Sequence, residues 1–239
     1  MYTIVQKTTP NKSSRCGWVP DIIVSHITEG SFNGAVSWLC NSVSEASAHF
    51  VISQKGEITQ LVPIYEMAWI NGTTTTDIND KRHYSKSTSK LVRDRKTNAN
   101  LYSVGIEHEG IYSKTKGELT DQQLNATIWL HGYIRDEVKS LYNREIIIDR
   151  EHILGHYEIN PITKPNCPGE NFPFEEIIQY FEEEDEMRYN TIEEVPDYAK
   201  LTVQKLTDKK LITGTDEGLD LSEDMIRLLV INDRAGLYE

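Results

Sequence analysis

The stretch D-I-I-V-S-H-I, residues 21–27, predicts a buried β-strand because it is short, apolar and rich in β-branched residues. His26 closes this strand, so its ring can project from the end of a sheet. Two further apolar runs, 48–53 and 58–63, flank the polar segment Q-K-G-E, in which Gly56 supplies the turn. This second pattern predicts a β-hairpin.

Strand and helix patterns continue along the chain. S-V-G-I-E-H at 103–108 predicts a strand with alternate residues on opposite faces. A capping box opens a predicted amphipathic helix over 120–142. Its helically spaced positions are Leu124, Ile128, His131, Ile134, Val138 and Leu141. The runs 146–148 and 153–154 predict a further strand with its continuation, and 174–181 predicts a second helix. With 38% apolar residues, the chain has room for a mixed sheet with helices on it.

The charge and composition exclude several classes of protein. Acidic residues outnumber basic ones by 37 to 25, giving a formal charge of −12. This argues against a nucleic-acid binder, which needs a basic face, and against electrostatic binding to anionic membranes. No long apolar run predicts a transmembrane helix, and the first residues lack a signal-peptide core. We therefore expect synthesis in the cytoplasm. Three cysteines are too few, and odd in number, for a disulfide framework.

The organisation of the chain predicts a main domain and a small module. The polar stretch 71–100 is too long for a routine connection, and we interpret it as one wall of a binding groove or, alternatively, as a surface excursion. The acidic run E-E-E-D-E at 182–186 indicates a linker. We expect a main domain over 1–182, an acidic linker over 183–194 and a helical module over 195–239.

Two histidines and one cysteine are candidates for a metal site. His26 and His156 each close a strand-like run, and Cys167 lies in K-P-N-C-P-G, where prolines hold its thiolate in place. This set suits Zn²⁺, which at a catalytic site takes three protein ligands and leaves a fourth position for water. His152 and His156 form a competing i, i+4 pair, but the glutamate of H-E-x-x-H is absent and Gly155 disfavours a helix.

Two carboxylates and one lysine are candidates for the chemistry. Glu107 and Glu109 lie in or just after the strand 103–108 and project on the same face. A carboxylate there can take a proton from a zinc-bound water, or it can be an ordinary solvated strand residue. Lys164 can stabilise the oxyanion of a tetrahedral intermediate, or be an exposed loop lysine.

The chain resembles the zinc-dependent N-acetylmuramoyl-L-alanine amidases, a superfamily that includes phage endolysins and peptidoglycan recognition proteins. Four stretches carry the resemblance, in the family's order. They are I-I-V-S-H-I-T at 22–28, S-A-H-F-V-I-S-Q-K-G-E-I-T-Q-L-V-P at 47–63 running on to A-W-I-N-G, S-V-G-I-E-H-E-G at 103–110, and G-H-Y-E-I-N-P-I-T-K-P-N-C-P-G at 155–169.

The resemblance implies a fold, an activity and a set of residues. It implies an α/β fold with a mixed central β-sheet flanked by helices and a zinc site in an open groove. It implies Zn²⁺ ligands at His26, His156 and Cys167, a base or proton shuttle at Glu107, and transition-state stabilisation by Lys164. The implied reaction is hydrolysis of the amide bond between N-acetylmuramic acid and L-alanine in peptidoglycan. The implied setting is a phage or prophage endolysin that lyses a Gram-positive wall after holin-type release.

The sequence departs from the family's pattern at three places. The segment from Lys164 to Cys167 is one residue longer than in many relatives, which affects the reach of the lysine. Ala48 stands where some relatives carry a tyrosine, and Ile70 stands where a histidine is common. These positions bear on contacts in the groove.

The tail, which begins Y-A-K-L-T-V-Q-K-L, resembles half of a wall-anchoring repeat of the S-layer-homology kind. One helix is predicted around Val203, Leu206 and Leu211, and another over 221–230 with Ser222 as its cap. The module is expected to bind the cell wall, or instead to mediate homodimerisation or pack on the main domain.

Three other functions compete with the amidase hypothesis. One is a non-catalytic peptidoglycan recognition module on the same fold, although relatives that only bind tend to lack the cysteine ligand. A second is a cysteine amidase that uses Cys167 as nucleophile and needs a histidine base but no zinc. The third is a structural zinc site, which would need a fourth ligand that the sequence does not show near Cys167.

Overall fold

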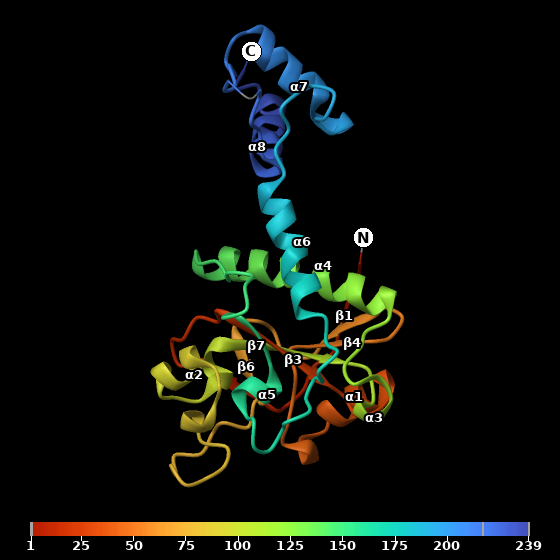
Figure 1. The fold of residues 1–239 in the computed structure, drawn as a ribbon, viewed down its shortest axis with the longest axis vertical. Coiled ribbons are helices and arrows are strands. Elements are labelled where there is room, and N and C mark those ends of the chain that lie inside the picture. Colours follow the sequence, from red (N-terminus) through yellow and green to blue (C-terminus); the bar gives the residue numbers. More distant parts are fainter. Residues whose placement is uncertain (1, 217, 239) are drawn as a thin grey trace. The chain divides into compact units, whose positions relative to one another are not determined.

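The computed structural model describes residues 2–216 and 218–238, and the chain divides into two compact units, Met1–Ile178 and Gln179–Glu239. The first unit, called the main unit below, holds a six-stranded sheet in the order β1-β5-β4-β7-β3-β8 (Figure 1). Its strands are β1 (Ile4–Gln6), β3 (Ile22–Ile27), β4 (Phe50–Ile52), β5 (Ile58–Gln60), β7 (Ser103–His108) and β8 (Ile153–Gly155). A smaller antiparallel sheet pairs β2 (Lys12–Ser14) with β6 (Glu66–Ala68).

The central sheet is mixed, as the sequence predicts. β3 pairs in parallel with both β7 and β8, and β7 pairs in parallel with β4. β4 and β5 form the one antiparallel pair of this sheet among the described residues, and Gly56 turns between them with φ +80°. The predicted hairpin is therefore confirmed. Every residue of β3 is buried, as expected for a parallel strand covered on both faces.

Helices cover both faces of the sheet, with α4 on one face and α1, α2 and α5 on the other (Figure 1). The helices of the main unit are α1 (Phe32–Leu39), α2 (Lys90–Arg95), α3 (Tyr112–Thr115), α4 (Asp121–Tyr142) and α5 (His156–Ile159). Short 3₁₀ turns lie at Ser42–Ser44, Tyr84–Lys86 and Ala99–Tyr102. The α/β class and the mixed sheet flanked by helices are confirmed.

The long helix α4 begins as predicted but buries a different stripe. Thr120 caps it by accepting a hydrogen bond from the backbone N–H of Gln123. The buried positions are Gln123, Ala126, Thr127, Leu130, His131, Ile134 and Val138, whereas Leu141 is 45% exposed. The predicted stripe was wrong at its ends because small and polar residues, which hydrophobic spacing ignores, also face the sheet.

Two other predicted elements differ from the structure. Residues 146–148 are not a strand, although Ile146 is buried, so the strand here is β8 alone. Helix α6 (Phe174–Glu186) continues beyond the predicted 174–181 and includes the acidic run, which is therefore helical. Glutamates are good helix formers, and two of them, at 175 and 176, lie in the first turn of α6, where the helix dipole favours negative charge.

The second unit contains α7 (Asp197–Asp208) and α8 (Glu223–Arg234). Ser222 caps α8 by accepting a hydrogen bond from the N–H of Met225, as predicted. A core of its own joins the helices through Val195, Ala199, Val203, Leu221, Ile226 and Val230. Leu211 lies outside α7 and is 60% exposed, so its predicted place in that helix was wrong. None of the described helices has the length and apolar character that crossing a membrane requires.

Candidate metal centre and active-site groove

Three side chains from separate segments converge on the face of the sheet that α1, α2 and α5 cover. His26 lies near the carboxyl end of β3, and His156 is the first residue of α5, directly after the neighbouring strand β8. Cys167 lies in the loop that follows α5. One ligand atom from each of the three lies within 4.8 Å of the others. The structure thus brings together the residues that the sequence singled out for a metal.

The donor set fits a zinc ion. The Nδ1 atoms of His26 and His156 face each other at 2.9 Å, and Sγ of Cys167 lies 3.9 Å from Nδ1 of His26. In a tetrahedral site the corresponding separations are roughly 3.3 Å for nitrogen to nitrogen and roughly 3.6 Å for nitrogen to sulfur. Nε2 of His156 faces the backbone oxygen of Asn71 at 3.2 Å, so that nitrogen carries the proton and Nδ1 offers a lone pair.

The electrostatics of the three ligands also favour a cation. Burial lowers the pKa of His156 to about 4 and that of His26 well below its ordinary value, so both rings are neutral at pH 7 and able to ligate. Burial raises the pKa of Cys167 to about 12, and the nearby carboxyl of Glu107 adds to the rise. Alone, the thiol keeps its proton; a metal ion favours the thiolate instead.

Glu107 lies beside the metal centre on the neighbouring strand. It pairs in register with His26, so the two side chains point to the same face of the sheet. The residue as a whole is half-buried, but its Oε2 atom is shielded from solvent and has no hydrogen-bond partner among the described residues. Burial raises the pKa of Glu107 to about 7, while the positive charge of Lys164 opposes the rise. Such a group can both accept and donate a proton near neutral pH.

Lys164 reaches the same groove. Its charge lowers the pKa of both histidine ligands, after the larger effect of burial, and it lines the groove with them. The groove has a volume of about 280 Å³. Its lining residues are His26, Ile27, Thr28, Glu29, Ala35, Trp38, Leu39, Ala46, Ser47, Trp69, Ile70, Glu107, His156, Lys164 and Cys167.

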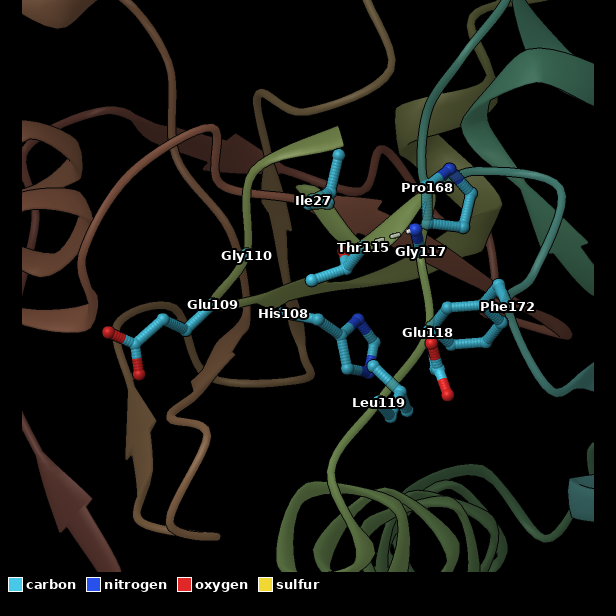
Figure 2. Close-up of a pocket in the computed structure, with 10 residues that line it drawn as sticks. All are labelled: Ile27, His108, Glu109, Gly110, Thr115, Gly117, Glu118, Leu119, Pro168 and Phe172. Atoms are coloured by element: carbon cyan, nitrogen blue, oxygen red, sulfur yellow. Dashed lines mark hydrogen bonds between the residues drawn. The ribbon is translucent and has the colours of Figure 1, made fainter. Parts of the chain in front are cut away.

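Glu109, the other candidate carboxylate, serves the fold. Figure 2 shows a small pocket that borders the end of β7, and the side chain of Glu109 points away from the other labelled residues. Its Oε1 accepts the backbone N–H of Phe32 at 2.9 Å, and its Oε2 accepts that of Gln54 at 2.8 Å. Glu109 therefore ties the start of α1 to the turn of the hairpin, and only Glu107 lines the groove.

Backbone contacts hold the loop that carries Cys167. The N–H of Ile27 donates to Sγ of Cys167 at 3.4 Å, and the N–H of Tyr157 donates to its carbonyl oxygen at 2.8 Å. The loop then packs on the turn around residues 115–119, which Figure 2 shows beside Pro168. The approach is so close that a Cβ at Gly169, where φ is +131°, would lie 2.1 Å from the carbonyl oxygen of Lys116. Glycine is thus required there.

Comparison with known proteins agrees with this geometry. The sequence profile described as N-acetylmuramoyl-L-alanine amidase matches residues 17–170, a segment that contains the whole metal centre. The chain belongs to the N-acetylmuramoyl-L-alanine amidase family. N-acetylmuramoyl-L-alanine amidase A of Achromobacter lyticus is 33% identical over 89 residues. That match covers 37% of this chain and 36% of the relative, so the chain spans about a third of that relative's length.

The fold of the main unit is similar to a solved structure. A crystal structure of AmpD superposes with a TM-score of 0.50 and 20% identity, over 75% of this chain and 94% of that chain. N-acetylmuramoyl-L-alanine amidase LysC from Clostridium intestinale URNW gives a TM-score of 0.47 and 22% identity, over 76% of this chain and 99% of that one.

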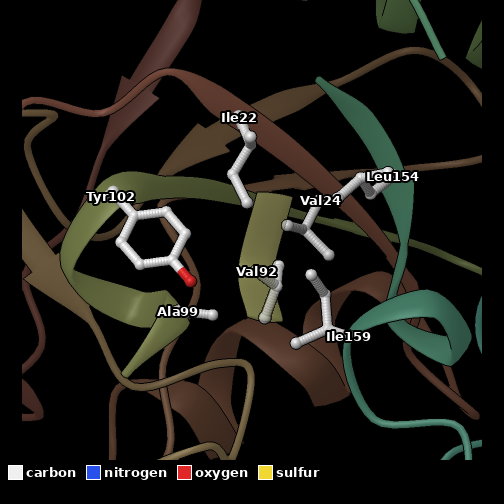
Figure 3. Packing of buried hydrophobic residues seen from close by; sticks show 7 residues of the cluster. All are labelled: Ile22, Val24, Val92, Ala99, Tyr102, Leu154 and Ile159. Carbon is white, nitrogen blue, oxygen red and sulfur yellow. The ribbon is translucent and has the colours of Figure 1, made fainter. Parts of the chain in front are cut away.

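The stretch 71–100 covers the sheet and does not form a wall of the groove. The lining residues of the groove come from outside these positions. Val92 of α2 instead packs into a buried cluster against the strands that carry the site (Figure 3). The cluster consists of Ile22, Val24, Val92, Ala99, Tyr102, Leu154 and Ile159. The stretch is polar in composition, yet a few apolar residues in it anchor β3 and α5 and so position the two histidine ligands.

The competing histidine pair does not form. β8 separates His152 from His156, and Nδ1 of His152 lies 2.7 Å from a carboxylate oxygen of Asp149. Sequence patterns do not single out Asn71, whose backbone oxygen faces Nε2 of His156. Its position in A-W-I-N-G was the only available signal, and that motif by itself does not show which atom meets the metal centre.

Proposed function

We propose that this chain is a zinc-dependent amidase that hydrolyses the bond between N-acetylmuramic acid and the first L-alanine of the peptidoglycan stem. One observation carries the proposal: the ligand atoms of His26, His156 and Cys167 cluster within 4.8 Å in a groove that Glu107 and Lys164 also line. Membership of the family indicates the substrate. In the groove, Glu107 offers a base and Lys164 offers a cation beside the three candidate ligands.

The three ligands hold the metal, and the protein's other groups handle protons and charge. Zinc, when bound, supplies a Lewis acid that activates water and polarises a carbonyl oxygen. His26 and His156 offer neutral nitrogens to it, and Cys167 offers a thiolate that the N–H of Ile27 stabilises.

Glu107 takes the proton of the attacking water and returns it to the departing alanine nitrogen. Burial raises its pKa to about 7 in the metal-free protein, so this carboxyl can exchange a proton near neutral pH. Lys164 contributes a positive charge in the same groove, where it stabilises the oxyanion that develops on the attacked carbonyl. Trp38, which is 55% exposed, and Trp69 offer apolar surface for the substrate in the same groove.

Two alternatives are less well supported. A cysteine amidase needs a reactive thiolate, and burial instead raises the pKa of Cys167 to about 12. A module that only binds peptidoglycan needs neither a buried carboxyl nor a complete set of ligands, and both are present here.

The biological setting extends this proposal. An endolysin role against a Gram-positive wall, with release through a holin, suits an amidase of this family. The helical module of the second unit would then anchor the enzyme to the wall or join two copies. Its separate core, around Val203 and Ile226, supports an independent role.

The test is digestion of purified Gram-positive peptidoglycan with and without a zinc chelator. We expect new alanine N-termini that disappear with chelator and return with Zn²⁺. Glu107→Gln should keep its zinc and lose on the order of 10²–10⁴-fold in turnover. Glu109→Gln, a change two residues away, should stay much closer to the wild-type rate because Glu109 does not line the groove.

Three other outcomes would contradict the proposal. New reducing sugars would indicate a glycosidase. Retained binding to the wall without any release would indicate a recognition module. Release that is unaffected by chelator and abolished by Cys167→Ala would indicate a cysteine nucleophile.

A further inference from the structure

Asn71 lies beside the metal centre and is 0% exposed. Its backbone oxygen faces Nε2 of His156 at 3.2 Å. The rings of His156 and His26 pack with their centroids 4.3 Å apart. Two polar atoms in this buried cluster, Oδ1 of Asn71 and Nε2 of His26, have no hydrogen-bond partner among the described residues.

The chemistry of the Asn71 amide matches what His26 needs. Its Nδ2 donates to the hydroxyl of Ser103 at 2.8 Å, which turns Oδ1 away from Ser103. An acceptor at Nε2 keeps the proton on that nitrogen and leaves Nδ1 with its lone pair directed at the metal.

Asn71 is itself held on two sides. Its backbone N–H donates to Oδ1 of Asn100 at 2.8 Å. Its backbone oxygen also faces Nδ2 of Asn160 at 3.4 Å, in addition to His156. These contacts limit the freedom of the residue, so that it can fix the orientation of the rings.

We propose that Asn71 is a positioning residue that fixes the tautomer and orientation of both histidine ligands, His156 through its main chain and His26 through its side chain. This inference rests on the zinc site proposed above. Outer partners of ligand histidines are worth about 10–100-fold in metal affinity. A substitution can remove only the side-chain contact to His26. The contact to His156 uses the backbone carbonyl oxygen, which every residue at position 71 retains.

The experiment compares three variants. Asn71→Ala removes the acceptor for His26, and Asn71→Asp retains an oxygen there. Thr73→Val is the matched control: Thr73 is 1% exposed, and its hydroxyl is hydrogen-bonded to Asn98 and Ala99 rather than to either ligand histidine. The readouts are the Kd for Zn²⁺ from competition with a chromogenic chelator, the visible spectrum of the Co²⁺-loaded protein, and the Tm of the metal-free protein.

We expect Asn71→Ala to bind Zn²⁺ about 10–100-fold more weakly and to change the Co²⁺ spectrum, with Asn71→Asp returning to within about tenfold of the wild-type Kd. Thr73→Val should lower the Tm and leave Kd and spectrum unchanged. An Asn71→Ala protein with wild-type Kd and spectrum would overturn the proposal, as would equal losses of affinity in Asn71→Ala and Thr73→Val. Absence of zinc binding by the wild-type protein would instead refute the zinc site itself.

Discussion

Replacing Glu107 with glutamine is expected to stabilise the metal-free protein at alkaline pH. Burial raises the pKa of Glu107 from 4.5 to about 7, so the folded protein holds this proton more tightly than the unfolded chain does. The resulting stabilisation is complete below about pH 4.5 and is lost as the pH rises through about 7. Glutamine has a similar shape and does not titrate, so the stability of the variant does not fall in this way as the pH rises.

The magnitude follows from the two pKa values. Relative to the fully protonated state, ionisation of Glu107 removes about 1 kcal/mol of stability at pH 5 and about 3 kcal/mol at pH 8. Between these pH values, the free energy of unfolding of Glu107→Gln should therefore rise by roughly 2–3 kcal/mol relative to wild type. Any constant cost of burying the new amide cancels from this comparison.

The assay is urea unfolding of chelator-treated protein at pH 5 and pH 8, followed by tryptophan fluorescence. All four tryptophans, Trp18, Trp38, Trp69 and Trp129, lie in the main unit, so the signal reports on the part that contains the site. Glu118→Gln, an exposed change, is the control and should show no such shift with pH. A relative shift below about 1 kcal/mol for Glu107→Gln would refute the reasoning, because it would mean that Lys164 compensates the buried carboxylate.

Two further predictions concern the framework of the main unit. Gly169→Ala should lower the free energy of unfolding by about 2 kcal/mol or more and weaken zinc binding, because a Cβ there meets the carbonyl oxygen of Lys116 at 2.1 Å; unchanged thermal unfolding would contradict this close approach of the loop. Leu130→Ala should cost about 2–5 kcal/mol, whereas Leu141→Ala should stay within about 0.5 kcal/mol, as urea unfolding can measure. Equal costs for the two leucines would refute the buried stripe described for α4.

Much of the fold could be predicted because its signals are local. The strand 22–27 is apolar at four of its six positions, and burial on both faces favours such runs in parallel strands. Gly56 supplies the positive φ of the hairpin, and Thr120 caps the long helix. Where local signals are ambiguous, prediction was wrong: Ile146 is apolar and buried, yet the segment 146–148 has no strand partner among the described residues.

The candidate site was predicted in part. The types and spacing of His26, His156 and Cys167, with the resemblance to a family, gave a ligand set before any distance was known. Sequence did not separate Glu107 from Glu109, since both are carboxylates two residues apart. The structure separates them: the oxygens of Glu109 accept backbone N–H groups, whereas Oε2 of Glu107 is shielded and unpaired among the described residues.

By itself, then, the sequence determined the elements along the chain and the kinds of side chain available for chemistry. Only the tertiary structure decided which of them meet. His26 and His156 are 130 positions apart, and they face each other because β3 and β8 are neighbours in the sheet. The backbone oxygen of Asn71 meets the His156 ring, 85 positions away in the sequence, for the same kind of reason. Hydrophobic periodicity indicates which face of an element is buried. Distances between remote segments depend on strand order and register, and no local sequence pattern specifies that order or register.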